Sequence, residues 1–157
     1  MGFATHLGPW LLGTVKNTTG TTAGNIRNMG STIVAQTIPV TYNTFGSLTG
    51  TLGAIPAGSL ITSVQIITSA AFSSATTLVV TIGGVDTATA TTITAAGVFP
   101  VTLASTFAAT AANVGSTDAL ITYTATGTAL TTGAATIVVS YVVRNGNGAA
   151  NPTSQQN

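Results

Sequence analysis

The sequence feature that most restricts the fold is an alternation of apolar and small polar side chains between residues 55 and 81. It opens with Pro56-Ala57-Gly58, a turn sequence, because proline cannot donate a ladder hydrogen bond and glycine accepts a positive φ. Two rows of period two follow, namely Leu60, Thr62, Val64 and Ile66, and then Leu78, Val80 and Ile82. A period of two is that of a β-strand with one buried face. The stretch therefore predicts two strands in one sheet of a β-sandwich, joined through the small residues 69–76.

The same pattern continues through residues 31–144, with turn signals between the apolar runs. Further strands are predicted over residues 31–44, 46–53, 97–103, 118–126 and 135–144. Strands separated by about 8 to 12 residues are typical of a sandwich. The predicted fold class is therefore all-β, an antiparallel β-sandwich that is jelly-roll-like.

Several details of this sandwich are predicted from single positions. Pro39 assigns its strand to a sheet edge, and Gly83-Gly84 predicts a tight hairpin turn. Residues 135–144 are apolar on both sides, which predicts a central strand covered on both faces. Residues 127–133 would join the last two strands as a hairpin with a long loop. Residues 107–112 are the one place where alanine density favours a helical turn.

The chain divides into three parts. Residues 1–30 lack a strand period and are predicted to be an extended N-terminal arm, residues 31–144 form the sandwich, and residues 145–157 form a short polar C-terminal tail. The arm contains an apolar cluster followed by a polar spacer with two cations. It is the predicted partner-docking segment, with Pro9, Trp10, Leu11, Leu12, Lys16 and Arg27 as its docking residues. The alternative is that Trp10 packs onto its own domain, as apolar side chains near a terminus usually do.

Charge is the most unusual part of the composition. Charged residues make up 3% of the chain, where about 25% is usual. The surface must therefore consist of Thr, Ser, Asn, Gln and Gly, which are polar and uncharged. Little electrostatic repulsion keeps such chains apart, so we expect a protein that assembles with itself, as a homotrimer, or with partners. The alternative is a secreted domain that tolerates low charge.

Several classes of function are disfavoured by the same shortage of reactive groups. The only acids are Asp86 and Asp118 and the only imidazole is His6, so neither a catalytic triad nor a metal site can be assembled, and we expect no enzyme and no cofactor. Asp86 and Asp118 are expected to accept hydrogen bonds at turns instead. Three cations are too few for a nucleic-acid footprint. The longest apolar stretch, residues 137–143, is far short of the about 20 residues of a membrane span.

The absence of cysteine bears on where the protein works. With no thiol, neither a disulfide framework nor a thiolate metal site is available. The first residues have no basic region and Gly8-Pro9 interrupts their apolar part, so they do not read as an export signal. This combination suits a particle that is assembled in a reducing cytoplasm and released later, as virions are.

Two segments resemble small virion proteins of tailed bacteriophages: IPAGSLITSVQIITSAAFSSATTLVVTIGG and, near the C-terminus, GTALTTGAATIVVSYVVRNG. In those proteins an IPAGA-like turn leads into a VTSV strand, an AFNSGT-like joint and a TVG turn. The opening ATHLGPWLLGTVKNTTGTTAGNIRNMGSTIVAQ looks like the beginnings of proteins from phages of marine bacteria.

The resemblance implies a component of the phage particle, and a capsid decoration or cement protein fits it best. Such proteins are of similar size, are commonly β-sandwich trimers, and use arms or tails to clamp neighbouring capsomers. The implied partner is the major capsid protein, and the implied location is the capsid exterior of a virion assembled in the host cytoplasm. Two alternatives stay open: a head-fibre or tail-fibre domain that recognises host surface glycans, and a secreted, fimbrial or surface-layer-like subunit.

Overall fold

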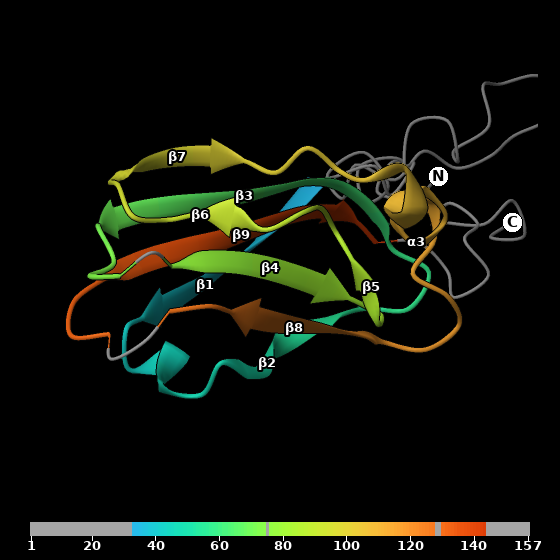
Figure 1. Ribbon diagram of the computed structural model, residues 1–157. Helices are drawn as coiled ribbons and strands as arrows, with labels where there is room; N and C mark the ends of the chain where they lie inside the picture. The colour runs from blue at the N-terminus through green and yellow to red at the C-terminus, as the bar shows by residue number, and fades with distance from the viewer. Residues whose placement is uncertain (1–32, 75, 128–129, 144–157) are drawn as a thin grey trace, which may run out of the picture.

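The structure is a computed structural model that describes residues 33–143 except residue 75 and residues 128–129. It consists of two antiparallel β-sheets (Figure 1). Sheet A has the strand order β1 (Ile33–Thr41), β9 (Ala134–Val142), β3 (Leu60–Ala70) and β7 (Gly97–Pro100). Sheet B has the order β2 (Thr49–Ile55), β8 (Ala119–Ala125), β4 (Thr77–Ile82) and β5 (Val85–Asp86), and β6 (Thr91–Thr92) also pairs with β4. The all-β class predicted from the sequence is confirmed.

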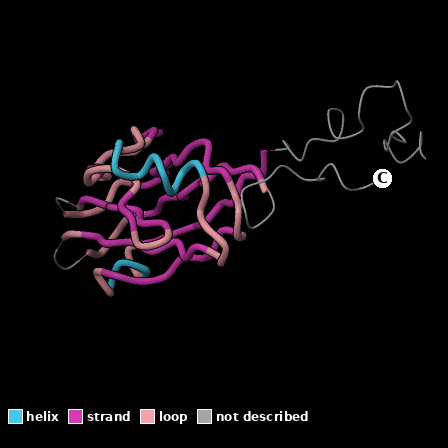
Figure 2. The backbone as a smooth tube through the Cα atoms, turned by 90° about the vertical axis from the view of Figure 1, so that its right-hand side faces the viewer, coloured by secondary structure: helices cyan, strands magenta, loops and turns pink. Residues whose placement is uncertain are grey.

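Helical structure is short and peripheral in the described part of the chain. It comprises η1 (Thr44–Gly46), η2 (Ser105–Phe107) and α3 (Ala108–Ala112). Figure 2 shows these segments at the outside of the stacked strands. The helical turn predicted at residues 107–112 is confirmed, and it contributes Phe107, which is completely buried.

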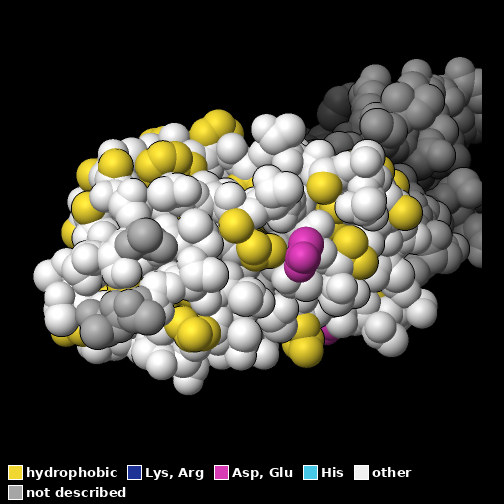
Figure 3. Space-filling view, in the orientation of Figure 1, with side chains coloured by type: hydrophobic (Ala, Val, Ile, Leu, Met, Phe, Trp, Pro, Cys, Tyr) yellow, Lys and Arg dark blue, Asp and Glu magenta, His cyan; other side chains and the backbone are white. Residues whose placement is uncertain are grey.

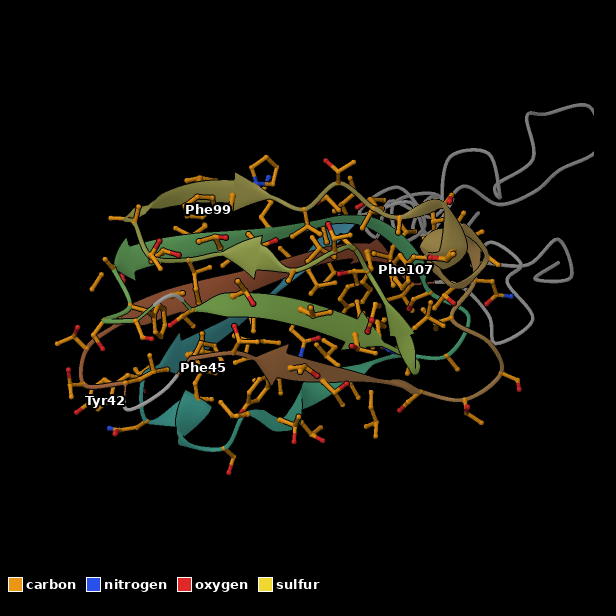
Figure 4. The ribbon with its side chains drawn as sticks, viewed as in Figure 1. Tyr42, Phe45, Phe99 and Phe107 are labelled. Carbon is orange, nitrogen blue, oxygen red and sulfur yellow. The ribbon has the colours of Figure 1, made fainter. Side chains whose placement is uncertain are left out.

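The core lies between the two sheets. Each long strand turns alternate side chains inward, and the fully buried positions come from both sheets, among them Ile55, Ile66, Ile82, Ile121, Ile137 and Val139. An aromatic cluster lies at one end, where the ring centroid of Phe45 is 5.2 Å from that of Phe72 and 5.1 Å from that of Tyr123. Figure 4 shows Phe45 and Phe107 toward opposite ends of the sandwich. Aromatic residues therefore fill both ends of an otherwise aliphatic core.

The strand β3 contains a β-bulge that the sequence pattern does not reveal. Its pairing with β9 shifts register between Ile61 and Ser63, so Thr62 is an extra residue on the β3 side. As a result Ile61 is buried while Thr62 is exposed, although simple alternation places Thr62 on the buried side with Val64. A bulge adds one residue and so reverses the alternation before it. The prediction for the first half of this strand was wrong for that reason.

Two predicted pairings were also wrong. The strands β3 and β4 were expected in one sheet, and β8 and β9 were expected to form a hairpin, yet β3 and β9 lie in sheet A and β4 and β8 lie in sheet B. Residues 71–76 and 126–133 therefore cross between the sheets. The period of two determines which side chains point inward, and it contains no information on which sheet completes the other side of the core.

Other local predictions are confirmed. Gly83 and Gly84 form a two-residue turn between β4 and β5, with φ of 60° and 80°, and two positive values are what a type I′ hairpin requires. Pro39 lies in β1, an edge strand. The strand β9 is central in its sheet, between β1 and β3. Its outward side chains are only partly buried, however, so the described residues cover one of its two faces.

Candidate docking surfaces

The outer face of sheet A is predominantly aliphatic, and we call it the apolar face. It consists of the side chains that point away from the core on four strands: Ile33, Ala35, Thr37, Pro39 and Thr41 of β1; Ala134, Thr136, Val138, Ser140 and Val142 of β9; Leu60, Ser63, Gln65, Ile67 and Ala70 of β3; and Val98 and Pro100 of β7. None of these residues is ionisable. The face thus combines aliphatic side chains with a few hydroxyl and amide groups.

The largest aliphatic side chains of the apolar face are accessible to solvent. Val98 is 61% exposed, Ile33 is 60% exposed and Ile67 is 36% exposed. The register places Pro39, Thr136, Ile67 and Val98 opposite one another in a single row across all four strands. Side chains in such a row are direct neighbours, so Ile67 and Val98 form one continuous apolar area.

The outer face of sheet B has a different chemistry, and we call it the threonine face. It consists of Thr49, Thr51 and Ala54 of β2, Leu120, Thr122 and Thr124 of β8, Thr77, Val79 and Thr81 of β4, and Asp86 of β5. One row across the sheet reads Thr51, Thr122, Thr81 and Asp86. The surface visible in Figure 3 is white over most of its area, with separate yellow patches and little magenta.

Neighbouring side chains on the threonine face hydrogen-bond to one another. The Thr81 hydroxyl donates to the Asp86 carboxylate at 2.6 Å, and the hydroxyls of Thr77 and Thr126 lie 2.7 Å apart. Cross-strand bonds of this kind satisfy part of the polar surface within the protein. The face therefore presents a partly self-paired layer of hydroxyl groups to its surroundings.

Asp86 and Asp118 are the only ionisable acids and both stabilise local structure. Asp86 was expected to bond within its turn, and it instead accepts from Thr81 on the opposite strand. Asp118 accepts a hydrogen bond of 3.0 Å from the backbone N–H of Ala57, in the turn that precedes β3. Within residues 33–143 as described, no three His, Cys, Asp or Glu side chains lie close enough together to hold a metal ion. No helix of that part is long and apolar enough to cross a membrane.

The docking residues predicted from the sequence lie outside the described residues. This applies to Pro9, Trp10, Leu11, Leu12, Lys16 and Arg27, and also to His6. The described chain starts at Ile33, which pairs with Val142 near its end. The segments 1–32 and 144–157 therefore adjoin the same end of sheet A.

The apolar face was not identified from the sequence. Its strongest members belong to three separate strands, and only their pairing brings them together. A local signal was present, because Ile67 follows Ile66, Val98 precedes Phe99, and residues 135–144 are apolar on both sides. Comparison of the chain with protein-family models, with curated proteins and with solved structures finds no match in any of the three.

Proposed function

We propose that the protein is a structural component of a tailed-bacteriophage virion, a capsid decoration or cement protein. It binds the major capsid protein on the capsid exterior, stabilises the head, and has no catalytic role. The observation that carries the proposal is the pair of broad outer faces without a cation, which suits a building block that works through contact. The cores of protein interfaces are depleted in charged residues.

The strand order supports a finer assignment of the fold as a jelly roll. Eight strands wound as two Greek keys give sheets of the order 1-9-3-7 and 2-8-4-5 when the short strands β5 and β6 together take one place. Jelly rolls recur in viral capsid proteins and in lectins. Since fold does not imply function, this likeness supports the proposal only together with the surface chemistry and the sequence resemblance.

The proposal includes a homotrimer with an N-terminal arm. The arm comprises residues 1–30, and its residues Pro9, Trp10, Leu11, Leu12, Lys16 and Arg27 contact a neighbouring subunit or the capsid surface. The segment adjoins sheet A at Ile33, and about 20 residues between Leu12 and Ile33 extend up to about 70 Å. The arm can therefore reach a neighbouring subunit. No nucleic acid and no membrane take part.

A second candidate is a head-fibre or tail-fibre domain that recognises host surface glycans. The threonine face favours it, because a layer of hydroxyl groups can exchange hydrogen bonds with neutral sugars. Sugar sites commonly add an exposed aromatic ring. In the described part of the chain the exposed large hydrophobic side chains are aliphatic, so the decoration protein remains the first proposal.

The number of copies per particle distinguishes the two candidates. We expect the protein at hundreds of copies in purified virions, because a cement protein occupies every capsomer site. Gel densitometry against the major capsid protein measures this ratio. Tens of copies or fewer would favour the fibre domain, and absence from washed particles would contradict both virion functions.

A further inference from the structure

The apolar face lacks a covering layer within the described part of the chain. Its central strands are β9 and β3, and beside them lie Val98 and Ile33, each about three-fifths exposed (61% and 60%). Exposed apolar area of this size on a small domain usually marks an interaction surface. The matching inward positions on the same strands are almost completely buried, so this sheet is apolar on both sides.

We infer that the apolar face packs against the same face of two further copies of this chain around a threefold axis. The inference rests on the self-assembly within the proposed function and is independent of the capsid partner. A face without ionisable side chains is compatible with itself, since no like charges meet when copies approach. A closed cyclic arrangement is also the usual form of a homo-oligomer.

The width of sheet A fits a threefold arrangement. Neighbouring strands lie about 4.8 Å apart, so a sheet that is three strands wide, and four beside β7, spans about 14 to 19 Å. Three sheets of that width that face a common axis each lie about 4 to 5.5 Å from it. Facing sheets in sandwiches are about 10 Å apart, which leaves about 5 Å for the side-chain layer of each. Three apolar faces therefore fill the centre without a channel.

The area is also sufficient. Nine residues of β1 or β9 extend about 30 Å, so each face offers roughly 500 Å² and three faces roughly 1,500 Å². A specific interface needs about 1,000 Å² in total. In this arrangement β1 of one copy lies beside β7 of the next, and both are edge strands. Assembly thus covers the two edges of sheet A, which otherwise offer unpaired backbone groups to other chains.

The threonine face provides a matched control for the test. Leu120 is the exposed large aliphatic residue of that face, and at 54% exposure it resembles Ile67 and Val98. The test compares Ile67→Lys with Leu120→Lys in the full chain by sedimentation velocity. We expect wild type and Leu120→Lys to have three times the mass of one chain, and Ile67→Lys to have the mass of one chain. A monomeric or dimeric wild type, or a trimeric folded Ile67→Lys, overturns the inference.

A second variant keeps the test decisive if Ile67→Lys fails to fold by circular dichroism. The chain has no cysteine, so Ile67→Cys or Leu120→Cys carries the only thiol. A short bismaleimide should link Ile67→Cys chains to one another and leave Leu120→Cys chains single. Equal linking of both variants, or linking of neither, contradicts the inference. A trimer that is absent from virions refutes the capsid function alone, whereas a monomer that is abundant on virions refutes the trimer alone.

Discussion

The two sheets resemble each other toward the core and differ toward the outside. Inward, β9 of sheet A contributes Ile137 and Val139, and β8 of sheet B contributes Ile121 and Tyr123. Outward, sheet A is aliphatic at Val98 and Ile67, while sheet B is a layer of threonines. Threonine and valine have the same shape and both favour strands, so the outer faces differ mainly in hydroxyl content. The difference teaches that stability and surface chemistry were set separately in this fold.

The largest effects are expected from the inward side chains, where the comparison predicts equality. Ile137 and Ile121 are both 0% exposed and lie on central strands of opposite sheets. We expect Ile137→Ala and Ile121→Ala each to lower the free energy of unfolding by about 2–5 kcal/mol, since each leaves a cavity. Chemical denaturation at one fixed protein concentration measures both.

Leu120→Ala is the control for this pair, because an exposed side chain should cost no more than about 0.5 kcal/mol. If one of the two core variants costs under about 1 kcal/mol, the sheet concerned does not share the core equally. The comparison between the sheets would then have to include their interiors.

A smaller difference is expected between two buried tyrosines, one from each sheet. The Tyr123 hydroxyl of sheet B lies 2.6 Å from the Thr44 carbonyl oxygen and 2.9 Å from that of Ser47, and so attaches η1 to β8. Among the described residues the Tyr141 hydroxyl of sheet A has no such partner. We expect Tyr123→Phe to lower the free energy of unfolding by about 1–2 kcal/mol and Tyr141→Phe by under about 0.5 kcal/mol. Thermal unfolding should rank the two in this order, and equal losses would argue against a special role for the η1 bond.

The smallest effect is expected from salt. Contacts through a face without ionisable groups should not depend on screening, so the trimer dissociation constant should change less than about twofold between 50 and 500 mM NaCl. Sedimentation equilibrium at both concentrations tests this. A weakening of tenfold or more would show that charges outside the apolar face, such as Lys16, Arg27 or Arg144, carry the association.

The candidate site was predicted from the sequence only in its chemistry. The shortage of charge correctly indicated an uncharged surface over the described residues, but the predicted docking residues Pro9 to Leu12 lie outside them. The apolar face escaped notice because Ile33, Ile67 and Val98 are far apart in sequence. Only the pairing of β1, β9, β3 and β7 makes them neighbours.

The sequence by itself determined the local features of this protein. Alternation in β4 and β8 correctly identified their buried sides, Pro39 marked an edge, and Gly83-Gly84 marked a hairpin, because each depends on the geometry of a few adjacent residues. The tertiary structure alone decided that β3 and β4 belong to opposite sheets, that β8 and β9 do not pair, and that a bulge at Thr62 buries Ile61. These outcomes depend on pairing between residues distant in the chain, where several arrangements bury the same side chains and only packing of the whole core selects one.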